Sequence, residues 1–286
     1  MHVKIVTDSA CDLPKSIYKD YDIDMAPLLV HLNNQDYYDG KTIEPKTVYD
    51  AMKEGAAPKT SQVSPEAFLD IFTSYVEQDQ PCVYIGFSSE LSGTFQSATI
   101  ARQQILDDHP DAKLYVVDTK CASLGQGLVA MRAAQLAKEG AEVEKIVETA
   151  EYHAKHMEHI FTVDDLEYLQ RGGRVSKAAA FFGGLLQIKP LLHVEDGKLI
   201  PLEKIRGTKK VLKRMFELME LRAHDINNQT VAISHADDLQ TAEKLAAMIN
   251  DKYEPKEIIV SNIGAAIGAH AGPCTISLFF LNNTHV

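Results

Sequence analysis

Three short polar segments carry side chains that could bind an anion. Residues 60–62 read Thr-Ser-Gln, residues 88–94 include Ser92, and residues 269–273 include His270. Each segment lies beside an expected strand end or helix start. In open α/β sheets, ligands bind beyond the carboxyl ends of the strands. Helix N-termini offer free backbone N–H groups and a positive dipole end. Together the three segments favour an anion site.

The same residue types also serve in helix capping. Serine and threonine are favoured N-caps, so Thr60 and Ser92 taken singly could act only as helix caps. Taken together, hydroxyl groups and a histidine N–H can satisfy a buried carboxylate without a buried lysine or arginine. Both readings remain open from the residues alone.

Motifs for several other chemistries are weak or missing. Residues 125–130 fit the dinucleotide fingerprint GxGxxG/A, but they begin well after the strand that is expected to end at Asp118, and no convincing ribose-binding acid follows. These glycines are therefore interpreted as shaping a helix entry. The sequence holds no GxxxxGK[ST] P-loop and no GxSxG serine motif. Residues 8–12, DSACD, lack the second aspartate of a phosphoaspartyl phosphatase.

Metal and redox sites are also disfavoured. His153, His156 and His159 recur every three residues, which predicts a solvated helix end better than the i, i+4 pair of HExxH. The four cysteines are scattered and form no CxxC pair, which argues against a zinc ribbon or a dithiol site. Free, scattered cysteines fit a reducing cytoplasm, so we expect a cytoplasmic protein.

Composition sets the class of protein. The chain has 286 residues, enough for two domains, and its 45% hydrophobic and 24% charged residues are ordinary for a globular protein. A formal charge of −11 disfavours nucleic-acid binding, because phosphate backbones repel an acidic surface. The longest apolar run, residues 178–186, is far shorter than the ~20 residues that cross a bilayer. The chain start reads as a strand and a polar turn, not as a signal peptide.

The first half of the chain alternates strands and helices. This alternation predicts βαβ units and an N-terminal α/β domain over residues 1–158, with three α/β/α layers and a mainly parallel sheet. The expected strands cover residues 3–9, 23–32, 82–87 and 113–118, and the expected helices cover residues 45–55, 65–77, 92–107, 127–138 and 143–157.

The pattern changes after about residue 160. Residues 190–202 form the clearest expected hairpin, because two alternating apolar runs flank Asp196-Gly197. A hairpin within an α/β pattern predicts a C-terminal α/β domain with a mixed sheet over residues 159–286. Extended segments are expected at 160–163, 230–234, 257–262 and 275–281, helices at 166–170, 208–223 and 239–253, and a glycine-rich turn before the last strand.

An ordered set of short motifs runs through the whole chain. In order these are TDSACDLP, TSQVS, GFSSELSGTFQSA, VVDT, VDDLEYLQRGGRVSK, KPLLHVEDGKLIP, EKIRGTKK and IGAHAGPCTISLFF. Each motif is short, but the set in this order is specific. It resembles the DegV family of fatty-acid-binding proteins. The resemblance implies the two-domain DegV-like fold and a long-chain fatty acid, as ligand and not cofactor, in a buried apolar tunnel.

The resemblance also implies which side chains hold the carboxylate. Carried over by motif, they are Thr60, Ser61, Ser92 and His270, with no metal and no catalytic residue. Two positions depart from the family pattern. Val63 stands where a proline usually follows TSQ, and Cys274 stands where a glycine usually follows AHAGP. Neither change removes a proposed ligand-binding group.

The resemblance further implies a carrier that works with a partner. Such a protein is not itself an enzyme. It presents the bound acid to a separate ATP-dependent fatty acid kinase subunit, which makes an acyl phosphate for phospholipid metabolism. Transient contact with a membrane surface fits this role. Arg174 and Arg206 lie in matching motifs, GGR and IRGTKK, and are predicted to bind the partner, although ordinary solvated charge is the alternative.

A second function stays open at this point. Ser92 and His270 could form a stand-alone lipid hydrolase, although no third residue that would orient the histidine is visible in the sequence. Two apolar segments, residues 178–186 and 191–194, could line a lipid tunnel or belong to an ordinary core.

Overall fold

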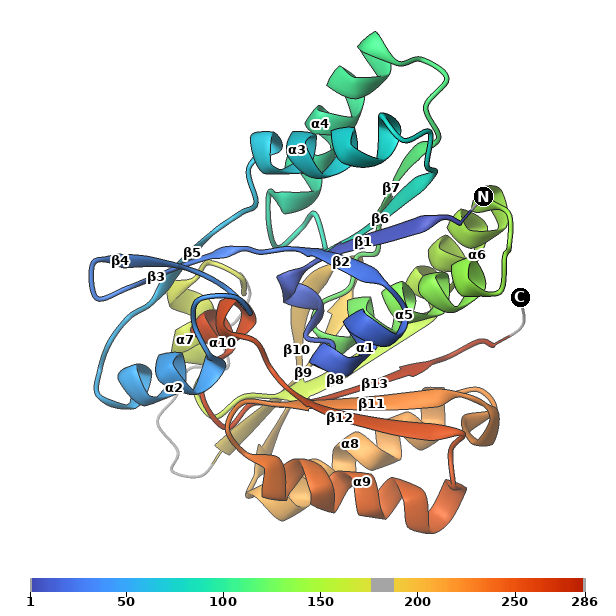
Figure 1. Cartoon of the computed structure of the whole chain (residues 1–286). Coiled ribbons are helices and arrows are strands. Elements are labelled where there is room, and N and C mark those ends of the chain that lie inside the picture. The colour runs from blue at the N-terminus through green and yellow to red at the C-terminus, as the bar shows by residue number, and fades with distance from the viewer. Residues whose placement is uncertain (1, 176–187, 285–286) are drawn as a thin grey trace.

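The computed structural model describes residues 2–175 and 188–284, and Figure 1 shows its layered arrangement. The first sheet has four strands in the order β2-β1-β6-β7, and all three pairings are parallel. Its central strands β1 and β6 are buried at every residue, as is usual for a parallel sheet that is covered on both faces. The strands are β1 (Lys4–Asp8), β2 (Ile23–Ala26), β6 (Cys82–Gly86) and β7 (Leu114–Asp118).

Helices cover both faces of this sheet. In Figure 1, α3 and α4 lie on one side of it, and α5 and α6 lie on the other. Pro65 occupies the first turn of α3, where its missing N–H costs nothing, and Ser64 caps the helix. The predicted three-layer α/β/α arrangement with a parallel sheet is therefore confirmed. The helices are α3 (Pro65–Val76), α4 (Thr94–Asp108), α5 (Leu124–Lys138) and α6 (Val143–His156).

A small antiparallel sheet, in the order β4-β3-β5, was not predicted. The sequence predicts one extended stretch over residues 23–32, but the structure divides it after Ala26. The first part joins the parallel sheet, and the second part pairs with β4 and β5. Two short helices flank this region. The elements are α1 (Lys15–Asp20), β3 (Leu29–Leu32), β4 (Gln35–Tyr38), α2 (Pro45–Lys53) and β5 (Lys59–Ser61).

The second large sheet is mixed, as predicted, with six strands in the order β10-β9-β8-β13-β11-β12. Only the pair of β11 and β12 is parallel among these described strands. The turn between β9 and β10 is Asp196-Gly197, with φ values of 48° and 80°, which is the backbone that a tight hairpin turn needs. The strands are β8 (Met157–Thr162), β9 (Ile188–Glu195), β10 (Lys198–Arg206), β11 (Thr230–His235), β12 (Glu257–Asn262) and β13 (Ile276–Leu281).

Helix α5 joins the two large sheets into one core. It contacts β1 and β6 of the first sheet and β8, β11 and β13 of the second. A single apolar cluster accordingly includes Ile5, Leu128 and Phe279. Helices α8 and α9 cover the opposite face of the mixed sheet (Figure 1). The remaining helices are α7 (Leu166–Arg171), α8 (Thr208–Arg222), α9 (Leu239–Tyr253), α10 (Ala265–Ala271) and two short 3-10 segments, η1 (Ser9–Cys11) and η3 (Ile226–Asn228).

The two large sheets use separate parts of the chain, residues 4–118 and 157–281. The domain boundary between residues 158 and 159 stays a prediction. Within the described ranges, no helix is both long and apolar enough to span a membrane.

Candidate functional site

The four residues predicted to hold a carboxylate line a shared cavity of about 340 Å³: Thr60, Ser61, Ser92 and His270. This volume falls within the ~300–1,000 Å³ that is usual for small-molecule sites. The space lies between elements of both large sheets, the small sheet and α10, and much of its wall is apolar. Apolar wall residues are Phe87, Leu91, Phe161, Leu199, Ile267 and Phe279.

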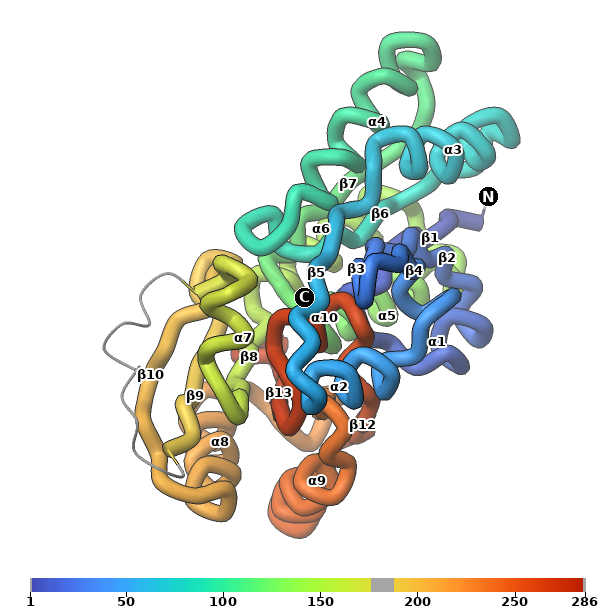
Figure 2. The backbone as a smooth tube through the Cα atoms, turned by 90° about the vertical axis from the view of Figure 1, so that its left-hand side faces the viewer, coloured from blue at the N-terminus to red at the C-terminus, as the bar shows by residue number. Residues whose placement is uncertain are grey.

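His270 is held at the cavity wall by α10. Its Nε2 lies 2.7 Å from Thr60 Oγ1, which joins α10 to β5. Figures 1 and 2 both place α10 beside β5 and α7. Burial, and then the nearby Arg174 guanidinium, lowers the pKa of His270 to about 4. The imidazole is therefore neutral at pH 7 and carries one N–H donor.

Two buried carboxyl groups fix the N-terminus of α10. Asp12 accepts a hydrogen bond of 2.8 Å from the Gly264 N–H, and Asp39 accepts one of 2.9 Å from the Ala265 N–H. Acidic groups are favourable at a helix N-terminus, because they satisfy free N–H groups and complement the dipole. Burial raises the pKa of both carboxyls. Asp12 belongs to the TDSACDLP motif, so that motif positions the helix that carries His270.

The close packing of α7 against α10 requires a glycine at position 172. A Cβ added there would lie 2.2 Å from His270 Nδ1, too close for the ring to stay in place. The glycine of the GGR motif therefore serves to seat His270 against the end of α7.

Ser92 both supports a helix start and lines the cavity, while its predicted role in carboxylate binding stays a prediction. Its Oγ accepts a hydrogen bond of 3.2 Å from the Thr94 N–H at the first residue of α4, and it also lies 2.9 Å from Thr94 Oγ1. It thus supports a helix start while it faces the cavity. Thr60 differs, because it lies in β5 and the cap of the next helix is Ser64.

Ser61 has a histidine partner that the sequence did not indicate. Its Oγ lies 2.7 Å from His31 Nε2, and His31 Nδ1 lies 2.6 Å from Asp36 Oδ1. The three residues come from β5, β3 and β4, which are adjacent strands of the small sheet. The local sequence showed only a histidine within an apolar strand. The contact with Ser61 forms only when the strands pair, so the local sequence could not indicate it.

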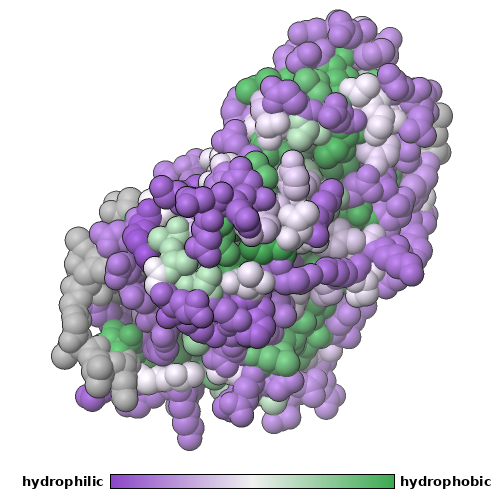
Figure 3. All heavy atoms as spheres, turned by 60° about the vertical axis from the view of Figure 1, so that its left-hand side comes forward, coloured by the Kyte–Doolittle hydropathy of each residue, from purple (hydrophilic) through white to green (hydrophobic). Residues whose placement is uncertain are grey.

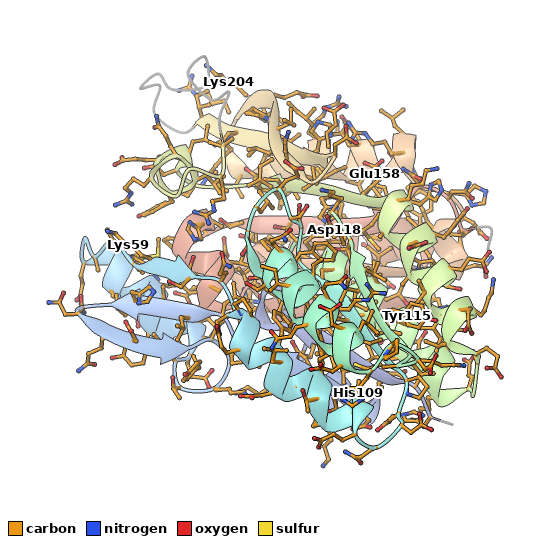
Figure 4. All side chains as sticks on the ribbon, turned by 90° about the horizontal axis from the view of Figure 1, so that it is seen from above. Lys59, His109, Tyr115, Asp118, Glu158 and Lys204 are labelled. Atoms are coloured by element: carbon orange, nitrogen blue, oxygen red, sulfur yellow. The ribbon has the colours of Figure 1, made fainter. Side chains whose placement is uncertain are left out.

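The two arginines predicted to bind a partner lie in different settings. Arg174 lines the cavity, is half-buried, and donates from Nε to the Leu91 carbonyl at 3.1 Å and from Nη1 to the Gly172 carbonyl. Arg206 is exposed at the end of the edge strand β10. Figure 4 shows Lys204 of the same strand at the outer side of the molecule. The cavity position of Arg174 was not predicted.

The two positions that depart from the family pattern, Val63 and Cys274, each make a backbone hydrogen bond in this structure. Val63 is buried, and its N–H donates to Thr94 Oγ1 at 3.4 Å, which a proline could not do. Cys274 has a φ of 62°, a left-handed backbone that glycine adopts without strain. Its N–H donates to the Ala236 carbonyl at 2.7 Å, which helps to hold this turn.

Asp8 ties the two central strands of the parallel sheet together beside the site. It is fully buried and accepts hydrogen bonds from Tyr84 Oη at 2.6 Å, Phe87 N at 3.0 Å, Gln126 Nε2 at 3.0 Å and Ala10 N at 3.1 Å. Burial raises the pKa of this carboxyl, and the four hydrogen bonds oppose that shift. The contact with Phe87 anchors the start of the segment that carries Ser92.

Three other features that the sequence singled out are the glycine fingerprint, the histidine series and the apolar segments. The glycines of residues 125–130 lie inside α5, where Gly125 packs against His159. His153 and His156 lie in α6, while His159 is buried in β8, and no group of three or more metal-binding side chains occurs in the described part of the chain. Of the two apolar segments, residues 178–186 lie outside the described residues, whereas Leu191 and Leu192 are buried in the core and Val194 lines the cavity.

Comparisons with known proteins agree on one family. The profile of the DegV family, described as "Uncharacterised protein, DegV family", matches residues 2–283. A DegV domain-containing protein of Clostridium perfringens is 44% identical over 283 residues, covering 98% of this chain and 97% of the relative. A protein of Thermotoga maritima named "Fatty acid-binding protein" is 36% identical over 287 residues, covering 96% of each chain.

A solved structure shows the same fold over the whole length. It is that of a DegV family protein from Thermus thermophilus, described in terms of its fatty acid binding. It superposes with a TM-score of 0.90 at 32% sequence identity and covers 98% of this chain and 99% of its own.

Proposed function

The chain belongs to the DegV family, and on that basis we propose that it binds a long-chain fatty acid in the cavity and presents the carboxylate to a partner kinase. The observation that carries the proposal is the convergence of hydrogen-bond donors on an apolar-walled cavity. Thr60, Ser92 and His270 come from three distant parts of the chain and line the same space. Relatives that are 36% and 32% identical bind fatty acids by name or description.

The physical chemistry of such a ligand fits this wall. Burying an alkyl chain gains ~0.8 kcal/mol per CH₂, on the order of 10 kcal/mol for sixteen carbons before ordering costs. A carboxylate needs hydrogen-bond donors once it leaves water, and hydroxyl and imidazole groups provide them. On the face shown in Figure 3, hydrophobic groups lie in recessed places between hydrophilic side chains. The ligand is therefore expected to be enclosed, with its carboxylate at the polar end of the cavity.

We expect the purified protein to carry one fatty acid of membrane-lipid length. The reason is that the apolar chain has no comparably favourable environment in water. Native and denaturing mass spectra should differ by the mass of one such acid, which also identifies the chain length. A ligand-free mass, with no uptake when the protein is incubated with fatty acid, contradicts the proposal.

The second part of the proposal concerns the partner kinase that would phosphorylate the bound acid. The sequence holds no P-loop, which fits phosphoryl transfer to the bound acid by a separate ATP-dependent subunit. Arg171 and Arg206 are exposed on a chain of net charge −11, and local basic groups of this kind can orient docking of a partner. We place this carrier in the cytoplasm, with all four cysteines as free thiols, and we expect transient contact with a membrane surface during loading.

We expect Arg206→Ala to reduce kinase-dependent acyl-phosphate formation roughly tenfold at low ionic strength while fatty-acid affinity stays unchanged, because lost electrostatic attraction slows docking. Lys244→Ala, which removes an exposed charge from α9, is the matched control. For Arg174→Ala the sequence predicts the same pattern, but the position of Arg174 on the cavity wall adds an expected loss of lipid affinity. Two assays on each variant, lipid binding and product formation with kinase subunit and ATP, separate these roles. If both variants support full turnover at limiting protein concentration, Arg174 and Arg206 do not contribute to partner binding.

The alternative hydrolase is not favoured by the contacts of its two residues. His270 Nε2 bonds to Thr60, and Ser92 Oγ bonds to Thr94. A serine nucleophile needs its base within hydrogen-bond reach. Hydrolysis of a fatty-acyl ester by the protein alone, lost in Ser92→Ala, would revive this alternative.

A further inference from the structure

A buried serine connects two parts of the cavity wall. Ser88 lies just after β6 and is fully buried. Its Oγ donates to the Gly197 carbonyl at 2.9 Å, and Gly197 lies in the turn at the tip of the β9–β10 hairpin. The chain after Ser88 supplies Leu91 and Ser92 to the wall, and the hairpin supplies Val194. One hydrogen bond thus joins two wall segments whose bonded residues are 109 positions apart in the sequence.

Ser88 also fixes the backbone of the turn over residues 88–92. Its carbonyl accepts hydrogen bonds from the N–H groups of Leu91 at 3.0 Å and Ser92 at 3.2 Å, and its Oγ accepts one from the Glu90 N–H at 3.3 Å. Its own N–H donates to the Cys121 carbonyl at 3.0 Å. A hydroxyl that donates one hydrogen bond and accepts another has a defined orientation. The position of Ser92 therefore depends on how Ser88 is held.

The tip of the hairpin is shaped for close approach to Ser88. Gly197 has a φ of 80°, which glycine adopts without strain. A Cβ added there would lie 2.5 Å from Ser88 Oγ and 2.8 Å from Lys120 Cδ, so a larger residue would push the tip away. Around this contact, Glu90 forms ion pairs with Lys198 at 3.4 Å and with Lys120 at 3.3 Å. Such solvent-exposed pairs contribute little, so we assign the fixing of the tip to the buried bond.

We propose that Ser88 is a positioning residue for Ser92: by tying the turn over residues 88–92 to the hairpin tip, it holds the Ser92 hydroxyl where that group can donate to a fatty-acid carboxylate. This inference rests on the proposed function and deepens it. A binding group is effective only when a supporting shell holds it in place. The carboxylate end of the site then needs a contact from the C-terminal part of the chain, although Ser92 itself belongs to the N-terminal part.

The test compares the affinities of oleate and oleyl alcohol, which has the same carbon chain and no charge. The ratio of the two dissociation constants measures the preference for the carboxylate and cancels effects on the apolar wall. Ser88→Ala should lower this preference roughly three- to tenfold, because a displaced Ser92 loses part of a hydrogen bond to a charged group. A merely structural role would weaken the binding of both ligands by the same factor.

A double-mutant cycle shows whether Ser88 acts through Ser92. When Ser92→Ala is already present, adding Ser88→Ala should change the preference by less than about twofold, because the group that Ser88 positions is gone. If Ser88→Ala does not fold, Ser88→Cys replaces it in the same cycle, since a thiol is close in size to a hydroxyl and is a weaker donor.

Thr162→Val is the matched control for a lost buried hydrogen bond. Thr162 is buried in β8, and its Oγ1 donates to the Pro190 carbonyl of β9 at 2.8 Å. The variant therefore loses a comparable bond from a strand outside the turn over residues 88–92. Its melting temperature should fall about as much as that of Ser88→Ala, while its preference for oleate over oleyl alcohol should stay at the wild-type value.

The outcomes distinguish the two proposals. If the wild-type protein binds neither ligand, or binds oleate no better than oleyl alcohol, the proposed carboxylate site fails, and this inference fails with it. If the wild-type protein prefers oleate and Ser88→Ala keeps that preference, only the inference is overturned. An equal loss of preference in Thr162→Val, or an undiminished effect of Ser88→Ala when Ser92 is already replaced, also overturns it.

Discussion

Asp8→Ala is expected to lower the free energy of unfolding by about 3–5 kcal/mol, because several buried donors would lose their acceptor at once. The Tyr84 hydroxyl, the Phe87 N–H and the Gln126 amide all donate to Oδ2 of this fully buried carboxyl. Each buried donor left unsatisfied costs about 1–3 kcal/mol. Urea denaturation of both proteins at pH 7 measures the difference.

Asp8→Asn provides the graded comparison. Its amide oxygen can still accept part of this network, so we expect a smaller loss than in the alanine variant. A loss below about 1 kcal/mol in Asp8→Ala would show that the sheet does not depend on this junction. Since the Phe87 contact anchors the segment that leads to Ser92, weaker fatty-acid binding should accompany the loss of stability.

The second large effect is on ligand affinity. We expect Ser92→Ala and His270→Ala each to weaken fatty-acid binding roughly ten- to a hundredfold, because a hydrogen bond to a charged group contributes ~1.5–3 kcal/mol. Melting temperatures should fall far less than affinity does. Titration with a fatty acid, together with thermal unfolding of each variant, provides both numbers.

Matched controls for these variants lie on the outer helices. Ser74→Ala in α3 and His109→Ala at the end of α4 remove the same groups from exposed positions. Figure 4 shows His109 at the periphery of the molecule. Both controls should bind like the wild type. Folded Ser92 and His270 variants with unchanged affinity would place the carboxylate elsewhere.

Much of the fold could be predicted because local patterns determine it. The hairpin of β9 and β10 follows from alternating residues around Asp196-Gly197, and the buried strand β1 follows from the β-branched residues Ile5, Val6 and Thr7. The prediction of a single extended stretch over residues 23–32 was wrong. Local composition indicates strand but does not say which sheet a strand joins, and here the chain changes sheets after Ala26.

The missed helix and the missed histidine have the same physical origin. Helix α10 is short and glycine-containing, and it is stabilised by Asp12 and Asp39, which lie more than two hundred residues away in the sequence. His31 acquires its partners only when three strands pair. By contrast, Thr60, Ser92 and His270 stood in recognisable motifs, so their meeting in one cavity could be anticipated, while their role stays a prediction.

The position of α5 between the two sheets limits how this chain can diverge during evolution. A substitution in α3, α4, α8 or α9 has to suit the single sheet face that the helix covers. A substitution in α5 has to suit two sheets at once, because Leu128 and its neighbours share a cluster with Ile5 and Phe279. The parts of the chain that form the two large sheets are therefore poor candidates for exchange by recombination between distant relatives. Each part supplies only one side of the packing around α5.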